Sequence, residues 1–287
     1  MIEEIEHREF GRCLKISNGD AEVIVSLDFG PRILGYALDG GENILGWHPE
    51  AAVETELGKW KPYGGHRLWV APEKMPLSYA PDNEKVDYLV EDETSALFSR
   101  PADAAGFEKQ FRIKFAERGS GISVDHKITN TRDEAVEVAA WALTIMRPGG
   151  EVVIPNEPFA PYSSEHLLPV RSMTLWSYTD FTDPRWTFEK DAIRLRVDEN
   201  LAHQQKFGVL NKQGWAAYEC EGMRFTKRFI TLDNAAYPDM NCNNEVYTAG
   251  GFVEVETLSR LNMLEQGESI EYEETWELSA IQFSGQT

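Results

Sequence analysis

One segment early in the chain combines residue types that can hold a polar ligand. In "KPYGGHRLWVAPE" (61–73), two glycines precede His66, Arg67, Trp69 and Glu73. A planar arginine fork suits neighbouring hydroxyls or a carboxylate, and an indole ring can pack against a ligand face. His66 can serve as an acid because its intrinsic pKa lies near neutrality. The structural alternative is an Arg67–Glu73 ion pair, with Trp69 in the core and the glycines forming a turn.

A second segment, "FVEVETL" (252–258), carries two carboxylates two residues apart. In an extended strand Glu254 and Glu256 share one face with Phe252 and Leu258, and two valines occupy the other. Carboxylates that are clustered and partly buried have raised pKa values, which suit a base. The alternative is a solvated outer face, which is common in antiparallel sheets. We predict that Glu256 lies in a cleft, with Glu254 beside it.

Two further residues are candidates for the same site. "MRFTKRF" (223–229) places Lys227 among apolar neighbours, so this lysine needs a carboxylate partner or a cleft. Glu254 or Glu256 is the predicted partner, and the alternative is a lysine that reaches solvent at a sheet edge. Trp141 shares a strand face with apolar residues, so core packing competes with ligand stacking there.

The elements that would position these residues are strands. Period-two alternation of apolar and polar residues recurs along the chain, and turn-forming segments separate the alternating stretches. We predict a helix only at 48–60, where it would be short, and a long loop over 156–190. Half-apolar sheets must bury one face against another sheet. The pattern therefore predicts one all-β domain over residues 1–287, a sandwich of large, mostly antiparallel sheets. Predicted strands include 107–115, 121–130, 136–146, 192–197, 214–220, 223–232, 252–258 and 269–278.

Composition limits the partners. The chain has 48 acidic and 28 basic residues, for a formal net charge of −20. Such a charge repels nucleic acid and anionic membrane surfaces, so neither is an expected partner. The longest nearly apolar run, 135–146, is too short to span a bilayer, and the first residues do not resemble a secretory signal. The expected location is the cytoplasm.

Several kinds of cofactor site have no support in the sequence. The three cysteines lack paired spacing, which argues against a disulfide framework or a four-cysteine zinc site. Histidine pairs at metal-ligand spacing, a P-loop and a dinucleotide-binding glycine motif are absent from the sequence. We therefore expect no metal and no cofactor.

Three segments, in this order, resemble the galactose mutarotase-like superfamily. They are "DFGPRILGYALDGGENILG", "GISVDHKITNTRDEAVEVAAWALTIMRPGG" and "GGFVEVETLSRLNMLEQGESIEYEETWEL". "GGHRLWVAPE", "WALTIMRPGG" and "ETLSRL" are similar to segments of one branch, the DUF4380-type proteins. The resemblance extends from about residue 20 to residue 278. It implies a β-supersandwich with a sugar-sized cleft on one sheet, and hence a small carbohydrate as the ligand.

The resemblance also assigns expected roles. In aldose mutarotases a glutamate acts as base on the anomeric hydroxyl, and a histidine acts as acid toward the ring oxygen. Glu256 matches the position of the base, and Arg67 corresponds to an arginine that lines the cleft. The place of the histidine is occupied by Ala140 and Trp141.

Three functions remain open. The first is binding of a monosaccharide or an acidic sugar derivative without chemistry, with Arg67 and Lys227 as the cations that would favour an acidic sugar. The second is an isomerase related to aldose 1-epimerase, with Glu256 as base and His66 as a relocated acid. The third is a structural sandwich with a vestigial cleft. The missing histidine favours the first.

Overall fold

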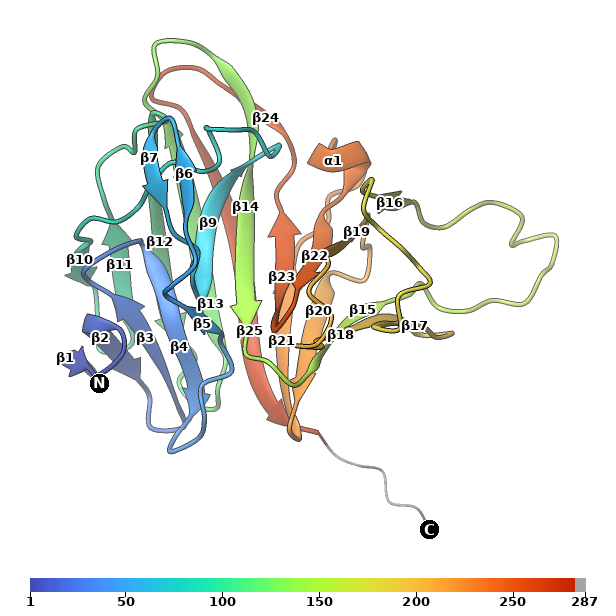
Figure 1. Ribbon diagram of the computed structural model, residues 1–287, viewed down its shortest axis with the longest axis horizontal. Helices are drawn as coiled ribbons and strands as arrows, with labels where there is room; N and C mark the ends of the chain where they lie inside the picture. The colour runs from blue at the N-terminus through green and yellow to red at the C-terminus, as the bar shows by residue number, and fades with distance from the viewer. Residues whose placement is uncertain (282–287) are drawn as a thin grey trace.

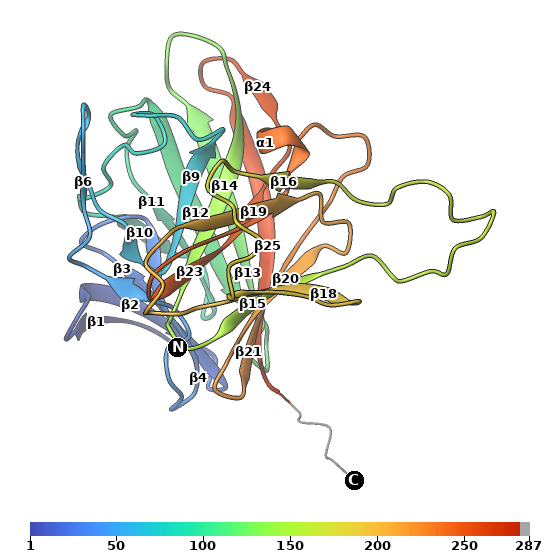
Figure 2. The same ribbon diagram turned by 45° about the vertical axis from the view of Figure 1, so that its right-hand side comes forward.

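The computed structural model describes residues 1–281 and consists almost entirely of β-strands (Figure 1). Two large sheets stack face to face, and the views in Figures 1 and 2 show the strands of both running along the sandwich. The first sheet has eleven strands and the second has ten. The predicted all-β sandwich is confirmed.

The eleven-stranded sheet contains the strands that matter most for the site, β9, β14, β23, β22 and β19, as consecutive neighbours. Neighbouring strands in this group pair antiparallel. In spatial order the strands are β1 (Ile2–His7), β2 (Gly11–Ser17), β3 (Ala21–Ser26), β4 (Arg32–Leu38), β9 (His66–Ala71), β14 (Val136–Met146), β23 (Phe252–Leu258), β22 (Asn244–Ala249), β19 (Gln205–Val209) and β16 (Met173–Leu175), and β24 (Asn262–Leu264) pairs with β14.

The ten-stranded sheet covers the inner face of the first. Its strands in spatial order are β10 (Asp87–Val90), β11 (Ser95–Ser99), β12 (Phe107–Phe115), β13 (Ile122–Asn130), β25 (Ser269–Ala280), β21 (Met223–Phe229), β20 (Trp215–Cys220), β15 (Glu151–Pro155), β18 (Ala192–Arg196) and β17 (Trp186–Phe188). Two small pairs, β5 (Trp47–His48) with β8 (Tyr63–Gly64) and β6 (Val53–Thr55) with β7 (Gly58–Trp60), and a single short turn of helix, α1 (Pro238–Asn241), complete the described part.

The main core lies between the sheets and follows from the alternation in the sequence. In β23, Val253 and Val255 are fully buried in this core, so the next residues along the strand face outward from the sandwich. Phe225 and Trp276 contribute from the second sheet. The alternation in the sequence therefore determines which side chains of β23 face away from the second sheet.

The predicted helix at 48–60 is wrong. This stretch forms the end of β5 and the hairpin of β6 and β7. Gly58 has a φ of +118°, which a residue with a side chain rarely adopts, and the Thr55 hydroxyl donates a hydrogen bond to the Gly58 carbonyl at 2.8 Å. A tight turn at this point interrupts any helix.

The predicted long loop over 156–190 agrees with the structure better than the predicted helix does. Residues 156–190 contain only the short strands β16 and β17, and the part before β16 extends away from the sandwich (Figure 1). The three cysteines are free and buried. Within residues 1–281, no helix is both long enough and apolar enough to cross a membrane.

Candidate functional site

A cleft lies on the face of the eleven-stranded sheet that points away from the second sheet. Its volume is about 470 Å³. The floor comes from β9, β14, β23, β22 and β19, and the walls come from the β6–β7 hairpin and the loops that carry Tyr79 and Tyr178. The polar and aromatic side chains of its lining include Trp60, Arg67, Trp69, Glu73, Tyr79, Trp141, Tyr178, Lys206, Tyr247 and Glu254.

Strand register brings the floor residues together. Trp69 of β9 is paired with Trp141 of β14, and Arg67 is paired with Leu143. Leu143 is in turn paired with Glu256 of β23. Side chains of directly paired residues lie on the same face of a sheet. The predicted grouping of Arg67, Trp69, Trp141 and the β23 glutamates on one face is therefore observed.

Arg67 and Glu254 form the first ion pair of the cleft. Arg67 Nη2 donates to Glu254 Oε1 at 2.9 Å, and the two side chains are 3% and 10% exposed. The guanidinium also lies 4.5 Å from the ring centre of Trp69 and 5.5 Å from that of Trp60. Among the described residues, Arg67 Nε and Nη1 have no hydrogen-bond partner. Both nitrogens are themselves buried, just beneath the cleft surface that Arg67 helps to line.

The alternative pairing of Arg67 with Glu73 is wrong. The Glu73 side chain is exposed at the cleft and accepts a hydrogen bond from the Tyr79 hydroxyl. Arg67 pairs instead with Glu254, which is 187 positions away in the chain and becomes its neighbour through the sheet.

Lys206 is the centre of a second cluster, beside the first. Its Nζ lies 2.9 Å from Glu245 Oε2 and 3.2 Å from Glu256 Oε2. The ammonium also lies 4.6 Å from the ring centre of Trp141, whose Nε1 donates to Glu256 Oε2 at 2.9 Å. Both carboxylates are fully buried. Glu256 therefore lies beneath Lys206 and Trp141, and Glu254 is the β23 carboxylate that reaches the cleft.

The protonation of this cluster is unusual because two buried carboxylates share one lysine. Burial raises the pKa of Glu256 to about 7, and Lys206 only partly opposes the shift. Burial also raises the pKa of Glu245 well above its usual range and raises the pKa of the nearby Asp239. Burial lowers the pKa of Lys206, but Glu245 and Glu256 outweigh it, so the net shift is upward. The lysine stays protonated, and its single positive charge cannot fully stabilise both carboxylates in their ionised form.

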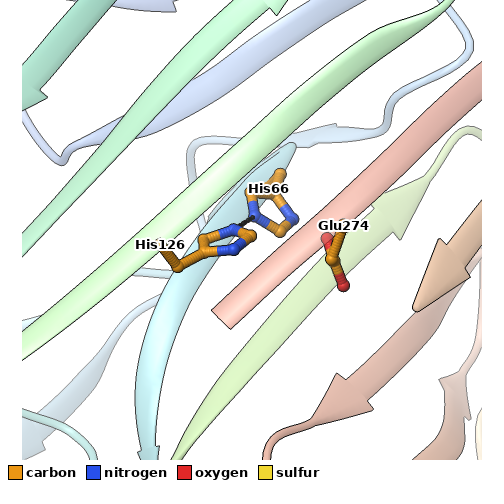
Figure 3. Close-up of side chains that lie close together, drawn as sticks. All are labelled: His66, His126 and Glu274. Atoms are coloured by element: carbon orange, nitrogen blue, oxygen red, sulfur yellow. Dashed lines mark hydrogen bonds between the residues drawn. The ribbon is translucent and has the colours of Figure 1, made fainter. Parts of the chain in front are cut away.

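His66 does not face the cleft. Because Arg67 points outward from β9, its neighbour His66 points inward and is fully buried between the sheets (Figure 3). His66 Nδ1 lies 2.9 Å from Thr144 Oγ1, and His66 Nε2 lies 2.8 Å from His126 Nε2. His66 thus shares no surface with Arg67 and Trp69, contrary to our expectation.

The proton positions in this histidine pair follow from its partners. His126 Nδ1 lies 2.9 Å from the Tyr272 carbonyl oxygen, which can only accept, so this nitrogen carries the proton. His126 Nε2 then accepts from His66 Nε2, and His66 Nδ1 accepts from the Thr144 hydroxyl. Both rings are neutral in this arrangement. Burial, as the main cause, lowers the pKa of each, which agrees with neutral rings.

Lys227 also lies between the sheets, and its predicted partner is wrong. Its Nζ pairs with Glu274 Oε1 at 3.0 Å, and it donates to the carbonyls of Ala142 at 2.9 Å and Val255 at 3.3 Å. The strand β21 belongs to the ten-stranded sheet, so its inward face meets the underside of the cleft floor. Lys227 therefore supports the floor from behind and is not part of the cleft lining.

His66, His126 and Glu274 place possible ligand atoms within 4.8 Å of one another (Figure 3). Hydrogen bonds account for these atoms. The two rings bond to each other, and Glu274 accepts from Lys227, from the Thr257 hydroxyl and from Trp276 Nε1. A cation placed here would also face the Lys227 ammonium. We assign the cluster to the hydrogen-bonded interior.

Sequence reasoning missed Lys206 and Glu245. Both lie on short strands, "QKFGV" and "NEVYTA", where Phe207, Val209 and Val246 alternate with them and enter the main core. The same alternation that located Glu254 and Glu256 was available in these segments. It was masked by Gly208 and by the Asn-rich run that precedes β22, both of which favour loops.

Comparison with known proteins shows which solved structures share this fold. No family model matches the chain, and no curated protein matches it significantly. Solved structures do match. A galactose mutarotase-like protein from Lactobacillus casei is 10% identical, with a TM-score of 0.57, over 93% of this chain and 100% of that one. The YeaD protein from Salmonella typhimurium is 12% identical, with a TM-score of 0.61, over 97% and 94%.

A galactose mutarotase related enzyme from Lactobacillus acidophilus is 9% identical, with a TM-score of 0.52, over 96% of this chain and 100% of that one. These likenesses span nearly the whole chain at very low identity, so they establish architecture. The resemblance to the superfamily is confirmed at the level of the fold, and the DUF4380-type branch stays a prediction. The chain has the galactose mutarotase-like fold.

Proposed function

We propose that the cleft binds a sugar of monosaccharide size. The observation that carries the proposal is the buried Arg67, with two unpaired N–H groups, beside Trp69 in a cleft of about 470 Å³. This volume lies within the range of about 300–1,000 Å³ that is typical of small-molecule sites. Unpaired buried donors lose free energy, and ligand hydroxyls can accept from them.

The rest of the lining supports the same ligand class. Glu254 and Glu73 supply acceptors, and the hydroxyls of Tyr178 and Tyr247 supply groups that both donate and accept. The indole rings of Trp69 and Trp141 form part of the floor and are 5% and 1% exposed, packed in an apolar cluster as the core alternative expected. Sugars present hydroxyls around their edge and C–H groups on their faces, so a lining that alternates charged and aromatic groups suits them.

Two features argue against the isomerase that uses Glu256 and His66. His66 lies behind the sheet, on the opposite face from Arg67, and so cannot reach a ligand in the cleft. Glu256 is fully buried beneath Lys206 and Trp141. We therefore favour binding as the function of the cleft.

Isothermal titration with a panel of neutral aldoses tests the proposal. We expect at least one to bind, and Arg67→Lys to weaken that binding about tenfold, because lysine lacks the planar fork. The matched control is Arg194→Lys, an arginine of β18 that pairs with Glu151 outside the cleft. Absence of binding by every sugar, or equal losses in both variants, would contradict the proposal. Polarimetry on the bound sugar should show no accelerated mutarotation, and rapid turnover would favour an isomerase.

A further inference from the structure

Carboxylates outnumber cations around the cleft. Within the described residues the lining contains Arg67 and Lys206 as cations, and Glu73 and Glu254 as anions. Glu245 and Glu256 lie directly beneath, in contact with Lys206. With Asp239 beside this cluster, five carboxylates face two cations. Even with both Glu245 and Glu256 protonated, three carboxyl groups remain for two cations.

Both cations are already paired. Arg67 bonds to Glu254 at 2.9 Å, and Lys206 lies 2.9 Å from Glu245 and 3.2 Å from Glu256. A carboxylate or phosphate on the ligand would compete with these buried pairs for the same cations. The free N–H groups of Arg67 can instead receive neutral hydroxyls. The cleft therefore disfavours acidic sugars, and our expectation of an acidic sugar derivative loses its basis.

Glu73 is the carboxylate at the cleft that no cation compensates among residues 1–281. Its hydrogen bond comes from the neutral Tyr79 hydroxyl, and its side chain is exposed at the cleft. Its charge acts across the cleft, since it raises the pKa of both Lys206 and Glu256. The rings of Trp60, Trp69 and Tyr79 pack with centroids 4.8–5.1 Å apart. Arg67 already lies over Trp60 and Trp69, whereas no cation among residues 1–281 lies over Tyr79, and aromatic faces attract cations.

We propose that the natural ligand is an amino sugar whose ammonium group is held by Glu73 against this aromatic wall. The inference rests on the proposed function, because it names the class of sugar that the cleft binds. A charge-assisted hydrogen bond to Glu73 would replace the missing cation. The hydroxyls of the same sugar would accept from Arg67 Nε and Nη1.

The test is a titration series on matched sugars. Glucosamine, galactosamine and mannosamine are each compared with their N-acetyl forms and with glucuronate and galacturonate, at a pH of about 6 that keeps the amines protonated. We expect one amine to bind on the order of tenfold more tightly than its neutral N-acetyl form, and the uronates to bind most weakly. Glu73→Gln should abolish the preference for the amine. The control is Glu117→Gln, an exposed glutamate in the turn after β12, which should leave the preference unchanged.

The outcomes separate the inference from the function it rests on. Neutral sugars that bind as tightly as amines, uronates that bind best, or a preference that survives Glu73→Gln would each overturn the amino-sugar inference and leave sugar binding intact. Failure of every sugar to bind would overturn both.

Discussion

Lys227 and Lys206 are both buried, and their surroundings differ in one respect. Lys227, between the sheets, has one carboxylate partner, Glu274, and two backbone carbonyls. Lys206, on the cleft floor, has two carboxylates, Glu245 and Glu256. The interior cluster therefore balances its charge without a bound proton, whereas the cleft cluster has one more carboxyl group than cation and balances by retaining a proton. Buried groups that are fully paired hold a structure together, and buried groups with unbalanced charge are typical of functional sites.

The same contrast holds for hydrogen-bond donors and acceptors. In the interior, the chain from Thr144 through His66 and His126 to the Tyr272 carbonyl uses each donor and acceptor of both rings. In the cleft, two N–H groups of Arg67 have no partner among the described residues. Burial alone therefore does not identify the site. Unpaired buried atoms also occur elsewhere in the described residues, but they are concentrated at the cleft, on Trp60, Arg67 and Glu256.

The largest expected effect comes from breaking the balanced cluster. Lys227→Met leaves Glu274 buried without its cation, and we expect it to lower the free energy of unfolding by about 3–5 kcal/mol. Chemical denaturation measures this loss. Lys227→Met combined with Glu274→Gln should recover part of it, because the buried charge is gone. A single variant that loses less than about 1 kcal/mol would show that the interior pair is not the structural element described.

A somewhat smaller effect on the free energy of unfolding comes from Glu256 in the Lys206 cluster, and this effect depends on pH. The folded pKa of Glu256 is raised to about 7, against 4.5 for an ordinary glutamate. Between these values the folded protein keeps a proton that the unfolded chain releases, so the stability from this group is complete below about pH 4.5. It is lost as the pH rises through 7, by roughly 3 kcal/mol in total.

The comparison of wild type with Glu256→Gln isolates this contribution. His66 and His126, whose pKa values are lowered, contribute the opposite slope in both proteins and cancel in the difference. As the pH rises from 5 to about 8, we expect the free energy of unfolding to fall less in the variant than in wild type. In the variant, Glu245 is the one ionisable carboxyl group paired with Lys206 among the described residues, so it can lose its proton and pair with the lysine. Urea denaturation measures the free energy of unfolding of both proteins at each pH. If the two pH profiles were parallel, they would contradict the description of Glu245 and Glu256 as two carboxyl groups that share Lys206.

Much of this architecture could be predicted from alternation in the sequence. The strands 107–115, 136–146 and 252–258 match β12, β14 and β23 in both bounds. The shared face of Glu254 and Glu256 follows from the same pattern. The sequence also places His66 and Arg67 on opposite faces, but the choice of the inward one depends on which side the second sheet covers.

The remaining errors come from strand pairings between segments far apart in the chain and from short strands, which local patterns do not encode. Lys227 was correctly expected to need a carboxylate, but Glu274 is its partner because β21 pairs with β25 in the second sheet. Lys206 escaped notice because β19 is short and contains a glycine. Long-range pairing thus decides which charged residues meet, even where their strands are predicted correctly.

A second cavity offers the sharpest alternative to the cleft. A groove of about 870 Å³ runs along β12, β13 and β25 of the ten-stranded sheet, and its lining includes Arg112, Asp125 and Glu273. It is larger than the cleft on the other sheet. Size alone would favour it. The number of unpaired buried groups favours the cleft, since Trp60, Arg67 and Glu256 have them there and the groove has the Tyr272 hydroxyl.

A crystal structure with the tightest-binding sugar of the panel tests this distinction most directly. We predict that the sugar lies over Trp69 and Trp141, with hydroxyls within about 3 Å of Arg67 Nε and Nη1. The interior pair of His66 and His126 should be unchanged. A sugar bound in the groove of the ten-stranded sheet, with Arg67 left unpartnered, would contradict the account.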